Sequence, residues 1–154
     1  MRFRRALVGA LTALMAAVAV LAVAEPAAAA IPRNCSRLGY DNGRAVHVTN
    51  DNNGGGAEVY ADLCYSSIGA NLYEAYVIWN VLDTKENGAG ATIRMEWQDW
   101  TGDMHYDVPD ADGRAWNYGD SIVDFWTGDN LRGLYVRACL TNTFSEGHHC
   151  GPKA

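Results

Sequence analysis

Turn-forming residues interrupt the chain at short intervals, and this spacing restricts the possible folds more than any other feature. Glycine, asparagine and aspartate, which tolerate positive φ, gather in clusters at 51–56, 86–90, 101–103, 110–113 and 127–130. The segments between the clusters show no sustained helical period. They fit short strands at a spacing of roughly 8–12 residues, so we expect an all-β chain without helices.

Alternation of apolar and polar residues is clearest over 91–97. Ile93, Met95 and Trp97 share one face, and the opposite face, predicted to be solvent-exposed, holds Thr92, Arg94, Glu96 and Gln98. Residues 104–108 repeat the pattern, with Met104, Tyr106 and Val108 predicted to face inward. The two segments therefore predict a hairpin that turns around Asp99–Asp103.

Further strands are predicted at 45–49, 57–65, 73–82, 115–126 and 131–140. Residues 45–49 and 57–65 form a hairpin across the glycine-rich loop. Residues 73–82 are apolar on both faces, which indicates a central, well-covered strand. We therefore predict a single two-sheet β-sandwich of seven or eight antiparallel strands, with a small barrel as the alternative.

The first 30 residues have the order of a secretory signal peptide. A cationic start is followed by an apolar run over 6–24, then by Glu25-Pro26 and the alanines 27–30. A transmembrane anchor is the alternative, but the alanine-rich run and Pro26 favour cleavage after Ala29 or Ala30. Residues 31–154 would then be one exported domain, extracellular and without a membrane anchor.

The exported part is acidic. It keeps 9 of the 12 Lys and Arg and 17 of the 18 Asp and Glu, a formal net charge of about −8. Such a domain repels phosphate backbones, so nucleic acid is not an expected partner. The acidity favours solubility, and it would also speed encounter with a basic protein.

All four cysteines, Cys35, Cys64, Cys139 and Cys150, lie in the exported part. An even number outside the cytosol indicates two disulfides. The favoured pairing joins Cys35 to Cys64 and Cys139 to Cys150, which closes a short C-terminal loop. Zinc binding by His148, His149 and Cys150 is the alternative, but the segment lacks a C-x-x-C knuckle.

No catalytic pattern stands out, so the chain is not expected to be an enzyme or to need a cofactor. There is no G-x-S-x-G elbow. His105 is expected to be solvated between Asp103 and Asp107, and His47, near Asp51 and Glu58, has no partner that would make it a base. Paired carboxylates could hydrolyse glycosides; the candidates near one hairpin are Glu96, Asp99, Asp103 and Asp107. Residues 110–113 resemble the start of a calcium loop but lack its later ligands, so a plain turn is favoured.

Aromatic residues and the N-terminal arm are the candidate binding groups. The chain has 5 Trp and 8 Tyr; Trp79 and Trp97 are expected in the core, but Trp100 and Trp116 are expected at the surface. Exposed Trp marks protein hot spots or sugar-stacking platforms. The arm, Ile31-Pro32-Arg33-Asn34, should be extended because Pro32 disfavours helix before it, and Cys35 would hold it for binding.

The ending Tyr135-Val136-Arg137-Ala138-Cys139-Leu140 with His149-Cys150-Gly151-Pro152, together with the alanine-rich leader, resembles small secreted proteins of actinobacteria. Among these the chain is similar to the adaptor subunit of umbrella toxin particles. That resemblance implies an antibacterial toxin complex in which the adaptor joins a lectin-bearing subunit to a toxin polypeptide and places an N-terminal segment in a partner's protease-like cleft. It covers residues 31–154 in size and type and carries no functional residue over.

We therefore expect a secreted, non-enzymatic module that binds another secreted protein through Ile31, Pro32, Arg33, Asn34, Trp100 and Trp116. A carbohydrate-binding module that stacks a glycan on Trp100 and Trp116 is one alternative. A secreted protease or glycosidase inhibitor with a rigid loop is another. The sequence lacks the Trp-Arg-Tyr signature of small amylase inhibitors.

Overall fold

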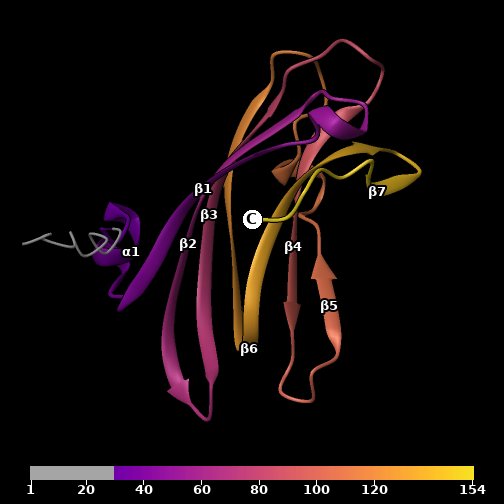
Figure 1. Ribbon diagram of the computed structural model, residues 1–154. Helices are drawn as coiled ribbons and strands as arrows, with labels where there is room; N and C mark the ends of the chain where they lie inside the picture. The colour runs from indigo at the N-terminus through magenta and orange to yellow at the C-terminus, as the bar shows by residue number, and fades with distance from the viewer. Residues whose placement is uncertain (1–29) are drawn as a thin grey trace, which may run out of the picture.

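The computed structural model describes residues 30–154, and the predicted signal peptide otherwise lies outside the described part (Figure 1). The chain forms seven antiparallel strands with neighbour order β1-β2-β3-β6-β4-β5, and β7 pairs with β6. Their bounds are β1 Asn42–Thr49, β2 Ala57–Gly69, β3 Leu72–Asp83, β4 Gly90–Gln98, β5 Met104–Asp107, β6 Ser121–Asn142 and β7 Ser145–His148. The all-β, antiparallel class is confirmed, and so are the hairpins β1–β2 and β4–β5.

Strand β6 organises the fold because it belongs to two groups of strands. Up to Leu131 it pairs with β3, and from Arg132 it pairs with β4. Between these stretches it bends back, with positive φ at Asn130 (55°) and Gly133 (62°), at the lower end of Figure 1. We call β1, β2, β3 and residues 121–131 the first half-sheet, and residues 132–142, β4, β5 and β7 the second. The predicted division into two separate sheets is not confirmed, because hydrogen bonding continues through β6.

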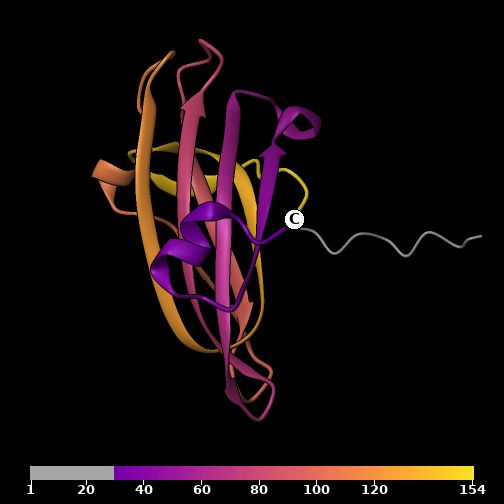
Figure 2. The same cartoon turned by 90° about the vertical axis from the view of Figure 1, so that its left-hand side faces the viewer.

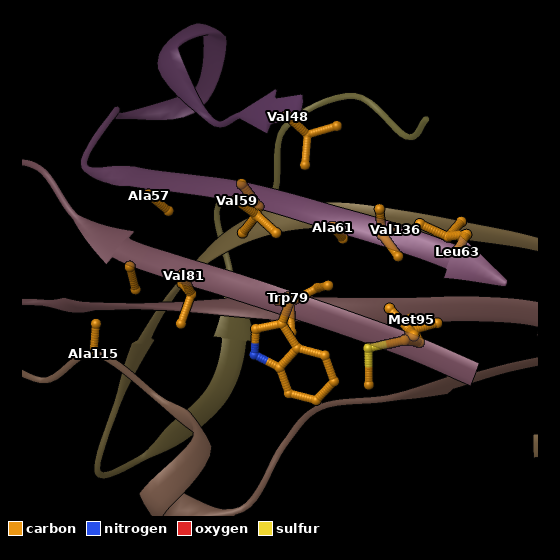
Figure 3. Packing of buried hydrophobic residues seen from close by; sticks show 14 of the residues in the cluster. Val48, Ala57, Val59, Ala61, Leu63, Trp79, Val81, Met95, Ala115 and Val136 are labelled. Carbon is orange, nitrogen blue, oxygen red and sulfur yellow. The ribbon is translucent and has the colours of Figure 1, made fainter. Parts of the chain in front are cut away.

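The core lies where the two half-sheets face each other (Figure 3). Val59, Val77 and Val81 from the first half-sheet meet Ile93, Met95 and Val136 from the second, and all six are fully buried. Trp79 packs among them with 2 % exposure, as predicted, but its Nε1 has no hydrogen-bond partner in residues 30–154. Each buried aliphatic side chain contributes about 1.5–3 kcal/mol, so this cluster supplies the main driving force.

The prediction of which side chains face inward was partly wrong in the β4–β5 hairpin. Thr92 is fully buried and Glu96 is 7 % exposed, because the chain after β6 folds over this face. Gly147 of β7 lies against Thr92, since a Cβ at this glycine would be 3.9 Å from the Thr92 side chain. Met104 and Tyr106 are exposed instead of inward, since the register pairs Tyr106 with Glu96 and His105 with Trp97.

Both predicted disulfides are present, Cys35–Cys64 and Cys139–Cys150. The first ties a short helix to β2. This helix, α1 (Arg33–Leu38), corrects the expectation of a chain without helices and of an extended arm at Arg33 and Asn34. Pro32 is extended and precedes the first turn, where the missing N–H costs nothing, and Gly39 ends the helix with a φ of 86°. In residues 30–154 no helix is long and apolar enough to cross a membrane.

Asn50 joins the loop after β1 to the C-terminal segment and is fully buried. Its Oδ1 accepts from the Ala57 amide at 2.8 Å, and its Nδ2 donates to the His149 carbonyl at 3.0 Å. Asn50→Ala is therefore expected to lower the free energy of unfolding by about 2 kcal/mol, because the buried Ala57 amide and the His149 carbonyl lose their partner. Urea unfolding would measure this, and Asn52→Ala, at an exposed position of the same loop, is the control. Equal stability of the two variants would contradict the assigned role.

Candidate functional site

The tryptophans that the sequence predicted as binding residues do not lie together in the structure. Trp100 lies at the β4–β5 turn and is 65 % exposed, as predicted. Trp116 follows Ala115, which bridges Ala91 at the opposite end of β4, and is 37 % exposed. The strand between them spans roughly 25 Å at 3.3 Å per residue, so one small ligand cannot stack on both indoles.

Trp116 is held in place by its neighbours. Its Nε1 donates to the Ala111 carbonyl at 2.6 Å, and its backbone amide donates to Asp120 at 3.2 Å. Several donors hold the pKa of Asp120 below its usual range, with the Asn117 backbone amide the strongest of them. The turn is thus satisfied internally, which suits a structural role.

The N-terminal arm lies against the first half-sheet. Helix α1 crosses the outer side of these strands, the side away from the core (Figure 2). The Asn34 amide donates to the Asp62 carboxylate at 2.8 Å, and Cys35 binds covalently to Cys64 on the same strand. Ile31 remains 40 % exposed beside them. The arm is therefore fixed at the border of a sheet face.

That sheet face carries large apolar side chains in the open, and the sequence did not nominate it. We call it the aromatic outer face and define it as Tyr60, Tyr76, Ile78, Val123 and Phe125. Val123 is 66 %, Phe125 55 % and Tyr60 47 % exposed. Cross-strand pairing brings Ile78 beside Phe125, and the rings of Tyr76 and Phe125 stack at 5.2 Å.

The surface is hollowed beside these side chains. A shallow depression of about 360 Å³ runs from Asn34 of α1 past Tyr60 and Ile78 to Val123. It joins the N-terminal arm to the outer face. The two features form one continuous surface.

Acidic groups border the aromatic outer face. Glu58 accepts from the Tyr60 hydroxyl at 2.7 Å, and this hydrogen bond raises the pKa of Tyr60 above its usual value. The same carboxylate oxygen lies 2.7 Å from His47 Nε2, and the His47 ring stacks on Tyr60 at 4.3 Å. Asp62 lies further along β2. The border therefore favours a partner with cationic groups.

The carboxylates that the sequence suggested for glycoside hydrolysis bind other residues of the fold. Asp99 accepts hydrogen bonds from Thr101, from His105 and from backbone amides of the turn, which hold its pKa well below its usual range. Asp107 accepts from Trp126 Nε1 at 2.8 Å, and Glu96 is flanked by Arg94 and Arg137. Each of these three carboxylates thus holds part of the fold together.

Metal binding finds no support in the part of the chain that the structure describes. There, no group of three or more His, Cys, Asp or Glu is placed to hold an ion. Cys150, a ligand in the zinc alternative, is bonded to Cys139. Residues 110–113, weighed as a calcium loop, form a turn closed by the Gly113 amide on the Asp110 carbonyl at 3.0 Å.

In comparisons with known proteins, no family model, no curated protein and no solved structure matched this chain.

A sequence signal for the outer face did exist. Residues 122–126, Ile-Val-Asp-Phe-Trp, place apolar side chains on both faces of one strand. Ile122 and Trp126 turn inward and are half-buried, whereas Val123 and Phe125 turn outward. A strand that is apolar on both sides needs cover on both, and nothing in residues 30–154 covers the outward pair.

Proposed function

We propose that this chain is a secreted, non-enzymatic module that binds another secreted protein with its aromatic outer face and N-terminal arm. The observation that carries the proposal is the exposure of Val123 and Phe125 on an otherwise well-packed sheet. Two disulfides in the described residues are consistent with an extracellular location.

The outer face differs from an ordinary solvated sheet face. Antiparallel sheets with one face in water place polar side chains there. Here the outward positions hold an aromatic cluster, and its members come from three adjacent strands. Contiguous apolar patches of this kind mark interaction sites, and Tyr and Phe supply much of the contact area at such sites.

Charge narrows the choice of partner. Glu58 and Asp62 stand on β2 next to Tyr60, and residues 31–154 carry a formal net charge of about −8. The complementary surface has an apolar centre and cationic groups at its rim. Such opposite charges raise the rate of encounter more than the final affinity.

The adaptor subunit of a secreted antibacterial toxin complex is the specific form that we propose, on the resemblance to small actinobacterial secreted proteins. The fixed arm supports it, because Ile31 and Pro32 extend from α1 beside the depression that Asn34 lines. One partner could therefore contact the arm and the outer face together. A segment already held by Cys35–Cys64 loses less entropy on binding.

Capture of a partner followed by measured affinities would test the proposal. The partner would be drawn from the secreted proteins of the producing organism, and its affinity for variants measured by calorimetry. Phe125→Ser is expected to weaken binding about 30-fold or more, as at a hot spot. Deletion of 31–34 is expected to weaken it several-fold.

Trp100→Ser is the matched control, since Trp100 is also more than half exposed but lies at the β4–β5 turn. It should leave the affinity unchanged. The reverse pattern, loss with Trp100→Ser and none with Phe125→Ser, would overturn the outer face as the interface. A captured glycan in place of a protein would favour the carbohydrate-binding alternative.

A further inference from the structure

A cleft opens between the half-sheets at the end where β6 bends. Its volume is about 310 Å³, and its walls are formed mainly by Arg44, Leu63, Tyr65, Tyr73, Leu131 and Tyr135. Leu63 and Leu131 form a buried apolar floor, and Tyr65 and Tyr73 meet edge to face at 5.8 Å. The volume falls at the lower end of the range for clefts that bind small ligands, about 300–1,000 Å³.

One cation, Arg44, lines this cleft, and a second, Lys153, packs on the ring of the wall residue Tyr135. Arg44 reaches across from β1 and donates from Nη2 to the Leu134 carbonyl at 2.8 Å. Lys153 Nζ lies 4.5 Å from the centre of the Tyr135 ring. Among residues 30–154 neither cation has a carboxylate within 4.0 Å, although the chain is strongly acidic. The cleft thus carries a guanidinium without a carboxylate partner, on a molecule that is acidic as a whole.

We propose that this cleft binds a small aromatic carboxylate, with the ring packed against the tyrosines of the wall and the carboxylate on Arg44. An engineered apolar cavity of about 150 Å³ holds one benzene ring. The cleft is about twice that size, which leaves room for a ring system and a short acidic tail. Arg44 keeps guanidinium donors free beyond the one used on Leu134, and a guanidinium binds a carboxylate through two parallel hydrogen bonds.

Arg44 also has a purely structural explanation. It sits on β1, an edge strand, and inward-pointing charges on edge strands prevent pairing with other chains. Its bond to Leu134 would serve that role without a ligand. The two explanations differ in one measurable property, because only a binding role makes the cleft prefer an acid to its neutral amide.

Titration of the full exported domain with indole-3-acetate and indole-3-acetamide would decide between them, by calorimetry and by chemical shifts of Tyr65 and Tyr73. We expect saturable binding of the acid with a dissociation constant below about 1 mM. The amide should bind about tenfold more weakly, because it cannot form the charge-assisted pair with Arg44.

Three variants would test whether the compounds bind in this cleft. Arg44→Gln should abolish the preference for the acid, whereas Arg37→Gln, which removes an exposed charge from α1, should keep it. Ala75→Leu narrows the cleft from β3 and should weaken both compounds; its fold would be checked by circular dichroism. Absence of saturation, equal affinities for acid and amide, or an unchanged preference in Arg44→Gln would each overturn the proposal.

Discussion

Replacing Cys35 and Cys64 together with alanine is expected to lower the free energy of unfolding by about 3.5 kcal/mol. The disulfide joins residues 29 positions apart, and both sulfurs are fully buried. Its loss gives the unfolded chain the entropy of an open loop. It also frees α1, whose six residues cannot hold a helix by themselves. Urea unfolding followed by far-ultraviolet circular dichroism would measure the change.

The second disulfide provides the matched control. Cys139–Cys150 closes a loop of only 11 positions, so the double alanine variant there should lose about 2.8 kcal/mol. Hydrogen exchange separates the two variants more sharply. Residues 33–40 should lose protection in the first variant and keep it in the second. A first variant with unchanged stability and a protected α1 would show that packing alone holds the helix.

Local patterns in the sequence were enough to predict most strands. Residues 91–97 and 73–82 alternate or are apolar throughout, and each is bounded by glycine-rich turns, so both correspond to strands in the structure. The favoured disulfide pairing followed from the short C-terminal loop between Cys139 and Cys150, which leaves Cys35 to pair with Cys64. These features depend on neighbours in sequence, which is why they could be read without the fold.

The sequence patterns did not predict the features that depend on tertiary contacts. Residues 127–130 were read as a turn between strands, and the chain does bend there, yet β6 keeps its hydrogen bonds to β3 before the bend and to β4 after it. Helix α1 forms where Cys35 is tied to β2. Its six residues are too few to show a helical period in the sequence. All four residues of β5 are exposed, so neither side of this strand faces the core, contrary to the predicted inward face.

The candidate binding surface shows the same division. Exposure of Trp100 followed from its place near a predicted turn, and the structure confirms it. The sequence of residues 122–126 shows a strand that is apolar on both faces, but which pair stays exposed, Val123 and Phe125, depends on which face of β6 the other half-sheet covers. The cleft at Arg44 joins residues of β1 and β6 that are 90 positions apart. Surfaces assembled from distant strands become visible only with the topology.

Glu96 is the clearest case of a residue whose role the fold reverses, from a solvent-facing acid to the centre of a charged cluster. Arg137 Nε donates to Glu96 Oε1 at 2.9 Å, and Arg94 Nε lies 3.1 Å from the same oxygen. Arg137 also donates to the Gly151 carbonyl at 2.8 Å, which holds the C-terminal segment in place. Arg94 covers the Tyr106 ring at 4.1 Å.

Glu96→Ala is therefore expected to lower the free energy of unfolding by about 3 kcal/mol, because it leaves two half-buried guanidinium groups without their shared carboxylate. Glu96→Gln keeps the size of the side chain and one hydrogen bond, so it should lose about half as much. Asp112→Ala, at an exposed position of the turn before Arg114, is the control and should change stability by less than about 0.5 kcal/mol. Because Arg137 links Glu96 to Gly151, hydrogen exchange at 151–154 should also rise in Glu96→Ala. Unfolding in urea at neutral pH would measure the stability, and mass spectrometry would measure the hydrogen exchange. If Glu96→Ala were as stable as Asp112→Ala, water would replace Glu96 as a partner of the two arginines. Packing alone would then hold the C-terminal segment.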